Sequence, residues 1–365
     1  MRPFIHFLAR RKLLSAIAIT LTVVGVAWAV WSGGRQSDPS LVSPSLAMKA
    51  LPSGSLYYNP AARPWLLAQR PELLVAADHD LNSPRSRNFA QAVLNPKVFR
   101  QLDRQERFAT LLFVGDPSQY RPLLDHLLDS KDWNVSYLDH TAILFRRGEE
   151  TAWNGGDLAR LRERFERPED AALFLAQAAS KLIAVRQAEK AEALLEEAAR
   201  LKTKVPDVAN AHAILHMSRG QWAQAVAQVN RALSLDDEFL PALATKAQLL
   251  YSMKKFPAAY DVSKKLIERS PSDPGLLFYH AKIAHEAHAY GEETRALEKL
   301  IALAEAEERP TTGYRLYLAQ AYAAAGKAKP AIEQFQVVLA DPDLPKEQRS
   351  FAQDTLAQVK SRSGF

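Results

Sequence analysis

Residues 211–237, AHAILHMSRGQWAQAVAQVNRALSLDD, carry a pattern of small and apolar residues that recurs through the second half of the chain. Its first small position repeats every 34 residues and, after four extra residues, once more. That position reads Ala179, Ala213, Ala247, Ala281 and Ala319. A period of this length indicates supersecondary units that bury a continuous core only when they stack on one another.

Three further positions keep the same register within each unit. The second small position reads Ala191, Ala225, Ala259, Glu293 and Ala331. The two apolar positions read Leu195, Val229, Ser263, Leu297 and Phe335, and then Ala198, Ala232, Leu266, Leu300 and Val338. Glu293 and Ser263 depart from the pattern, so the unit that contains Glu293 is expected to be irregular.

This pattern resembles the tetratricopeptide repeat (TPR), a 34-residue helix–turn–helix unit, over residues 172–345. The resemblance implies a mostly α fold, an α-α superhelix of five helix pairs. The expected copies are 172–205, 206–239, 240–273, 274–307 and 312–345. Residues 346–365 then form a capping helix and tail with a polar outer face. The alternative, a generic helical bundle, does not require the 34-residue register.

Repeats of this family bind proteins in a concave groove lined by the first helix of each pair. The resemblance places eight residues in that groove: Asn210, Met217, Gln248, Tyr251, Phe278, Lys282, His285 and Gln320. Their amide, aromatic and thioether groups suit an extended peptide or a helix, although each could simply be a solvated surface residue. The family's carboxylate clamp is not expected, because its positions hold Ser180, Ile214, Thr245 and Gly275.

The amino terminus predicts a transmembrane helix. Arg10, Arg11 and Lys12 precede Leu13–Trp31, a segment without a charged residue that is long enough to cross a bilayer. The excess of basic residues before it places residues 1–12 in the cytoplasm and the rest of the chain outside, as in a single-pass protein of the bacterial inner membrane. A cleaved signal peptide ending at Ala27-Trp28-Ala29 and a twin-arginine signal are the alternatives.

Residues 32–55, rich in Ser, Pro and Gly, are expected to be a linker. Residues 56–150 then predict a small α/β domain, and residues 151–171 a connecting helix. Strands are expected at ELLVAA (72–77), FATLLFVG (108–115), WNVSYLD (133–139) and TAILFRR (141–147), with helices near 86–105 and 118–129. Because Pro122 would break a continuous helix, the first turn of the second helix is expected to be separate.

Several classes of function are disfavoured. Gly115-Asp116-Pro117-Ser118-Gln119 resembles a helicase phosphate sensor, but the chain has no phosphate-binding loop, so a turn capped by Asp116 explains it. The net charge of +6 comes mainly from residues 1–55, with six basic residues against one Asp, so nucleic acid is not an expected partner.

His212 and His216 are expected to be core histidines. We expect no metal, no cofactor and no catalytic residues, Asp78, His79 and Asp80 included.

The segment DWNVSYLDHTAILFRR is similar to the soluble tails of bacterial O-mannosyltransferase-type glycosyltransferases. The similarity rests on Trp133, Tyr137, Asp139, Arg146 and Arg147, and it implies a non-catalytic accessory domain because the membrane core of that family is absent. The sequence therefore predicts a membrane-anchored extracytoplasmic scaffold that binds a protein partner and acts in the assembly of the cell envelope. The alternative is a component that acts on envelope glycans or lipid-linked sugars through residues 56–150.

Overall fold

The structure is a computed structural model that describes residues 44–52, 54–74, 89, 91–115, 117–148, 158, 162–163, 165–306, 310–342 and 344–363. The chain divides into two compact units, residues 1–46 and 47–365. The expected membrane segment at 13–31, Asp78–Asp80 and Asp116 lie outside the described residues. Within the described part of the chain, no helix combines the length and apolar character needed to cross a membrane.

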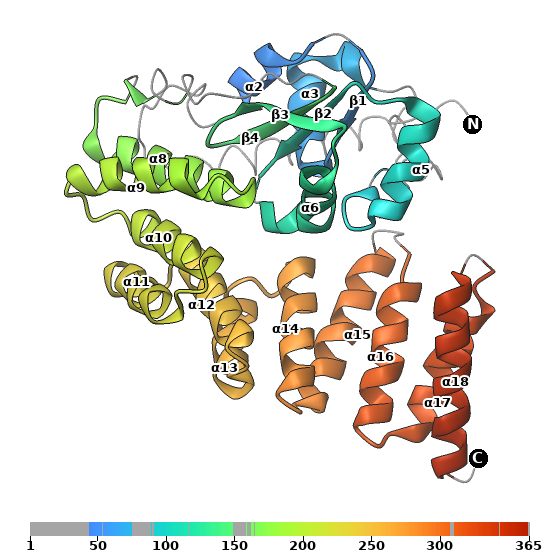
Figure 1. The fold of residues 1–365 in the computed structure, drawn as a ribbon. Helices are drawn as coiled ribbons and strands as arrows, with labels where there is room; N and C mark the ends of the chain where they lie inside the picture. The colour runs from blue at the N-terminus through green and yellow to red at the C-terminus, as the bar shows by residue number, and fades with distance from the viewer. Residues whose placement is uncertain are drawn as a thin grey trace, which may run out of the picture. The chain divides into compact units, whose positions relative to one another are not determined.

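The α/β domain is built on a four-stranded sheet (Figure 1). Its strands are β1 (Leu56–Tyr58), β2 (Thr110–Val114), β3 (Trp133–Leu138) and β4 (Ala142–Arg147). Their order in the sheet is β1-β2-β4-β3, with β1 parallel to β2 and the other two pairs antiparallel. A short turn joins β3 and β4 into a hairpin, and Asp139 Oδ1 accepts hydrogen bonds from the backbone N–H groups of Thr141 and Ala142 there.

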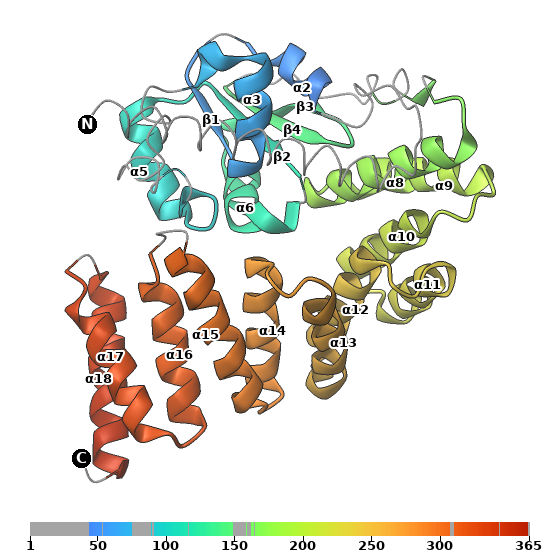
Figure 2. The ribbon, with the colours of Figure 1, turned by 180° about the vertical axis from the view of Figure 1, so that it is seen from behind.

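Helices cover both faces of this sheet. Successive strand residues point to opposite sides, and the apolar side chains on each side pack against helices. On one face, Met48 and Leu66 pack against Leu112 and Leu144; they come from α2 (Ser45–Ala50) and α3 (Arg63–Gln69). On the other face, the Tyr57 ring contacts side chains of α5 (Pro96–Glu106) and of the segment preceding β2. Beside them α6 (Arg121–Asp129) buries three leucines. Figure 2 shows α3 in front of the sheet.

The structure corrects four expectations around this domain. The expectation of a linker at 32–55 is wrong for the part of that segment that the structure describes, since α2 forms there and Ala47 and Met48 are buried. The strand expected at 72–77 is wrong at its start, because Pro71–Leu73 is a 3-10 turn. The helix expected near 86–105 is interrupted: Phe89, Gln91 and Ala92 are helical, a turn follows at residues 93–94, and α5 begins at Pro96, where Asn95 caps it. The connecting helix expected at 151–171 does not run without a break to its end, because Arg167 is extended and the residues from Pro168 onward belong to α8.

The expectation from Pro122 is confirmed: a separate 3-10 turn, Pro117–Tyr120, precedes α6. A strand that the sequence did not predict is β1, which has only three residues.

Five helix pairs follow in chain order, as the 34-residue period predicts (Figures 1 and 2). Four of the five first helices begin at the first residue of the expected copy, and a single helix closes the array. The elements are α8 (Pro168–Ala184), α9 (Ala188–Arg200), α10 (Pro206–Ser218), α11 (Trp222–Leu235), α12 (Leu240–Ser252), α13 (Phe256–Arg269), α14 (Pro274–Glu286), α15 (Tyr290–Ala306), α16 (Thr312–Ala324), α17 (Ala328–Ala340) and α18 (Lys346–Ser363).

All twenty residues of the four register positions are buried, the two departures included. Ser263 occupies a position that is otherwise apolar, and its buried hydroxyl has a partner there: it lies 2.8 Å from Nδ1 of the buried His280. Glu293 is held by His285, whose Nδ1 lies 3.1 Å from both carboxylate oxygens. The unit containing Glu293 is irregular as expected, because α15 runs to 17 residues.

The first helix pair is fixed to the α/β domain by polar and aromatic contacts. Nζ of the buried Lys181 donates a hydrogen bond of 2.8 Å to the carbonyl oxygen of Gly115, at the end of β2. The His140 ring, in the β3–β4 turn, meets the Phe174 ring of α8 edge-on at 4.9 Å. Buried polar groups such as the Lys181 ammonium need a hydrogen-bond partner, and the α/β domain supplies it. The first helix pair therefore packs directly on that domain.

Replacing Ala247 with leucine is expected to lower the free energy of unfolding by about 1–3 kcal/mol, because three added carbons must enter a packed helix contact. Ala247 is fully buried and packs with Ala259, Leu266 and Ile283. Ala223→Leu is the control, since Ala223 is exposed on α11. Urea melts should separate the two variants, and equal midpoints would show that the helices do not approach closely at Ala247.

Candidate functional site

A pocket of about 190 Å³ opens on the repeats around α14. It takes residues from the first helices of three consecutive pairs, α12, α14 and α16, and from α15. Its lining residues are Tyr251, Phe278, Ala281, Lys282, His285, Glu286, Glu293, Leu297, Tyr317 and Gln320. Five of the eight residues that the sequence assigned to the groove are thereby brought together.

Helical spacing explains why α14 supplies half of the lining. Phe278, Lys282 and Glu286 are separated by four residues each, and His285 lies three residues after Lys282, so they share one face of the helix. The opposite face buries Leu277, His280 and Ile283 in the stack. One helix therefore presents an aromatic ring, a cation, an imidazole and a carboxylate in a row.

Three aromatic side chains form the apolar part of the pocket. The Phe278 ring lies edge-on to Tyr317 with centroids 5.1 Å apart, and it also contacts Tyr314. Tyr317 is 45% exposed, whereas Phe278 and Tyr251 are half-buried. Such rings offer a large contact area that loses little conformational entropy on binding.

The polar part of the pocket holds both signs of charge. Lys282 and Glu286 are exposed, whereas Glu293, which also lines the pocket, is buried against His285. Burial raises the pKa of Glu293, and the neighbouring His285 opposes that shift. A partner could therefore exchange hydrogen bonds with an ammonium, an imidazole, an amide and a carboxylate within one site.

The other three predicted groove residues lie outside this pocket. Asn210 is only 7% exposed and its Oδ1 has no hydrogen-bond partner. Met217 packs against the core cluster that contains Val229 and Leu249, and Gln248 is exposed on α12. Tyr317 was missed, although its spacing of three residues from Gln320 on the same helix was a usable signal.

The stability of the chain is expected to fall as the pH rises from 4.5 through the raised pKa of Glu293. Below 4.5, the ordinary value, this carboxyl is protonated in both the folded and the unfolded state, so its burial costs little. Above the raised pKa, the folded state must hold a buried carboxylate. Glu293→Gln removes that cost, so urea midpoints of variant and wild type should diverge as pH increases. Parallel curves would contradict this prediction.

Within the described residues, no three His, Asp or Glu side chains are grouped as metal ligands would be. The rings of His212 and His216 stack at 6.4 Å, and His216 Nδ1 lies 2.7 Å from Gln221 Oε1. Both residues are half-buried, so the expectation that they belong to the core holds only in part. The fully buried histidine of the repeats is His280.

No family model and no curated protein sequence matches the chain. Among solved structures, MamA from Desulfovibrio magneticus RS-1 aligns at 20% identity over 46% of this chain and 93% of its own, with a TM-score of 0.39. YrrB, described as a TPR protein with an unusual peptide-binding site, aligns at 14% identity over 50% and 92%, with a TM-score of 0.42. The pilF protein of Pseudomonas aeruginosa aligns at 15% identity over 54% and 92%, also with 0.42.

Structural contacts account for four of the residues that carry the resemblance of residues 132–147 to glycosyltransferase tails. The Tyr137 hydroxyl donates a hydrogen bond of 2.6 Å to Asp139, which caps the hairpin turn. The Arg147 guanidinium lies 4.4 Å from the centroid of the Trp133 ring. The resemblance stays a prediction.

Proposed function

We propose that the chain is a scaffold that binds a protein partner through the pocket on α12, α14 and α16. The observation that carries this proposal is the convergence of Tyr251, Phe278 and Tyr317 from three consecutive first helices on one pocket. Aromatic side chains dominate the energetics of protein interfaces when a partner covers them. A stack of helix pairs repeats such positions along one surface, which suits an extended segment.

The size of the pocket supports a macromolecular partner. Sites for small organic ligands usually enclose roughly 300–1,000 Å³, whereas this pocket measures about 190 Å³. It can hold one or two side chains, so most of the partner must lie outside it. We therefore infer that a side chain of a peptide segment enters between the three rings and that its neighbours contact Lys282 and Glu286.

The proposal is tested by a photo-crosslinking amino acid placed at single positions of the full chain in its native host. A crosslinker at Tyr317, which lines the pocket, should capture a discrete protein. The control position is Val337, which is 50% exposed on α17 and is not among the lining residues. Equal capture at both positions, or capture at Val337 alone, would contradict the proposal.

We propose further that residues 13–31 anchor the chain in the inner membrane and that the repeats act outside the cytoplasm, in the assembly of the cell envelope. The support is the apolar segment after Arg10, Arg11 and Lys12. A periplasm-active reporter fused after Phe365 should be active, and the chain should stay in the membrane fraction after carbonate washing. A soluble chain with a new terminus at Val30 would contradict the anchor and show that residues 1–29 are a cleaved signal peptide.

A further inference from the structure

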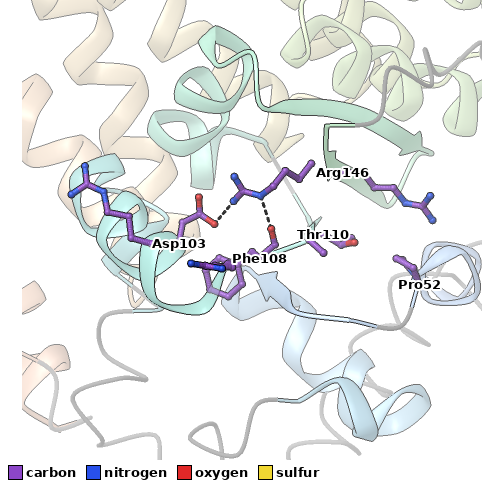
Figure 3. A pocket seen from close by; sticks show the side chains of 9 residues that line it. Pro52, Asp103, Phe108, Thr110 and Arg146 are labelled. Carbon is purple, nitrogen blue, oxygen red and sulfur yellow. Dashed lines mark hydrogen bonds and ion pairs between the residues drawn. The ribbon is translucent and has the colours of Figure 1, made fainter.

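A second and larger pocket, of about 770 Å³, lies in the α/β domain at the edge of the sheet where β2 begins and β4 ends. Figure 3 shows Thr110 between Asp103 on one side and Arg146 on the other, with Pro52 on the side of Arg146. Arg147 is paired with Asp103. The basic side chains of this arginine pocket are therefore divided between two sides of the sheet edge and do not meet at one point. Its lining residues are Pro52, Asp103, Arg104, Arg107, Phe108, Ala109, Thr110, Arg146 and Arg147.

The repeat pocket, which is the pocket of about 190 Å³ on α12, α14 and α16, gathers its charged groups in a smaller space. Glu286 and Glu293 supply two carboxyl groups, and Lys282 supplies one ammonium group. The Glu293 carboxyl is already held by His285. Among the residues that the structure describes, no hydrogen bond or ion pair occupies the Glu286 carboxylate. Glu286 is therefore the carboxylate that remains open to a partner.

Glu286 lies beside one of the aromatic walls of the repeat pocket. Burial raises the pKa of the Tyr251 hydroxyl, and the charge of Glu286 raises it further. Because such an effect falls off with distance, the carboxylate faces the Tyr251 side of the pocket. The Tyr251 ring contacts Phe256 with centroids 5.5 Å apart, whereas the Phe278 ring contacts Tyr317. The rings therefore form two separate walls, and the carboxylate belongs to the first.

Lys282 does not cancel the charge of Glu286. The two residues are four positions apart on α14, a spacing that allows an ion pair, yet no ion pair joins them within the described part of the chain. Both side chains are exposed. The long stem of a lysine lets its ammonium stay in water when the surface beside it is covered, so Lys282 can leave the space between the two walls.

The chemistry of the walls favours one kind of side chain in that space. A side chain that covers the rings also removes water from the Glu286 carboxylate. An apolar side chain would leave this carboxylate without a partner, at a cost in free energy, whereas a cation would form a charge-assisted hydrogen bond with it. The faces of aromatic rings carry partial negative charge and attract a cation that lies within about 6 Å of the ring centroid.

We propose that the partner side chain that enters the repeat pocket is a basic one, lying between Tyr251 and Phe278 with its charge on Glu286. The inference rests on the proposed function and names the chemistry of the segment that the repeats bind. Arginine is favoured over lysine, because its planar guanidinium stacks on aromatic rings and forms two parallel hydrogen bonds to a carboxylate. The Gln320 side chain, which also lines the pocket, offers an amide oxygen as a further acceptor.

The test uses the full chain in a neutral detergent and the partner captured by the crosslinker at Tyr317. Glu286→Gln removes the charge and keeps the shape of the side chain, so it should weaken binding of this partner by about tenfold or more. The matched control is Glu268→Gln, the same change at an exposed position of α13 outside the pocket, which should bind as the wild type does. The proposal is overturned if the two variants bind equally, or if Lys282→Gln weakens binding more than Glu286→Gln does.

A second arm identifies the side chain itself. The crosslinked segment of the partner is mapped by mass spectrometry and synthesised with each arginine replaced by citrulline and each lysine by acetyl-lysine, which remove the charge and keep a similar shape. One replacement should weaken binding to the wild type by about tenfold or more. The same replacement should have little effect on binding to Glu286→Gln, because the pair is already broken there.

The two ways of failing are distinguishable. A segment whose binding no replacement weakens would overturn the basic side chain and leave the proposed function intact. If the crosslinker at Tyr317 captures no protein, the proposed function fails, and this inference falls with it.

Discussion

Replacing Phe335 with alanine is expected to lower the free energy of unfolding by about 3–5 kcal/mol, the usual cost of removing a buried ring. Phe335 is 0% exposed and packs with Leu316, Val338 and Leu344 in the cluster shared by α16, α17 and α18. The cavity left behind cannot collapse easily, because three helices fix its walls. In a repeat array each unit contacts only its neighbours, so the loss should be concentrated in the last pair.

The matched control for this prediction is Phe351→Ala on α18. Phe351 is 47% exposed, so its removal deletes the same atoms without opening a cavity, and the urea midpoint should move little. Hydrogen exchange should show faster opening of α16–α18 in Phe335→Ala and unchanged exchange in the α/β domain. Equal shifts of the midpoint for the two variants would contradict the repeat register.

Replacing Tyr251 and Phe278 together with alanine should weaken partner capture by about 2–4 kcal/mol, roughly 30- to 700-fold in Kd. The two rings come from adjacent first helices and line the same pocket. In the free chain both are half-buried, so their removal should destabilise the fold less than Phe335→Ala does. The effect on binding should therefore exceed the effect on stability.

The control for this second prediction removes two aromatic side chains elsewhere, by Trp222→Ala with Phe351→Ala. Both residues are exposed, and neither lines the pocket. Capture of the partner identified by crosslinking should be unchanged in this variant. If the Tyr251/Phe278 variant is folded and captures that partner normally, the pocket is not the binding site.

The repeats could be predicted from the sequence because their signal is redundant. Each register position occurs five times, so Glu293 or Ser263 in one copy did not obscure it. What the sequence could not supply is the partner of each departure. His280 lies 17 residues from Ser263 and His285 lies 8 residues from Glu293, each on a different helix from its partner, so the packing of the helices brings them within hydrogen-bond reach.

The α/β domain was harder to predict because its signals are short. The run at 72–77 is apolar enough for a strand, yet Pro71 starts a 3-10 turn. Leu56–Tyr58 pairs with β2 in parallel over only three residues, too few for a periodic pattern. Residues 45–50 belong to a stretch whose Ser and Pro content indicated a linker, and burial of Ala47 and Met48 overrides that composition.

The two pockets differ in how far the sequence could reveal them. Five residues of the repeat pocket follow from the register of the helices, because a single helix face supplies most of them. The arginine pocket has no such local pattern. The residues of the α/β domain carry equal numbers of acidic and basic side chains, and four arginines come to line one pocket only because β2 and β4 pair beside the end of α5.

Hydrogen–deuterium exchange of the full chain, with and without the partner captured at Tyr317, tests the central claim most directly. The partner should slow exchange in α12, α14 and α16, the helices that form the repeat pocket. Exchange in β1–β4 should stay unchanged, because the proposed interface does not include the sheet. Protection confined to the α/β domain, with unchanged exchange in these three helices, would contradict the assignment of the repeats as the binding surface.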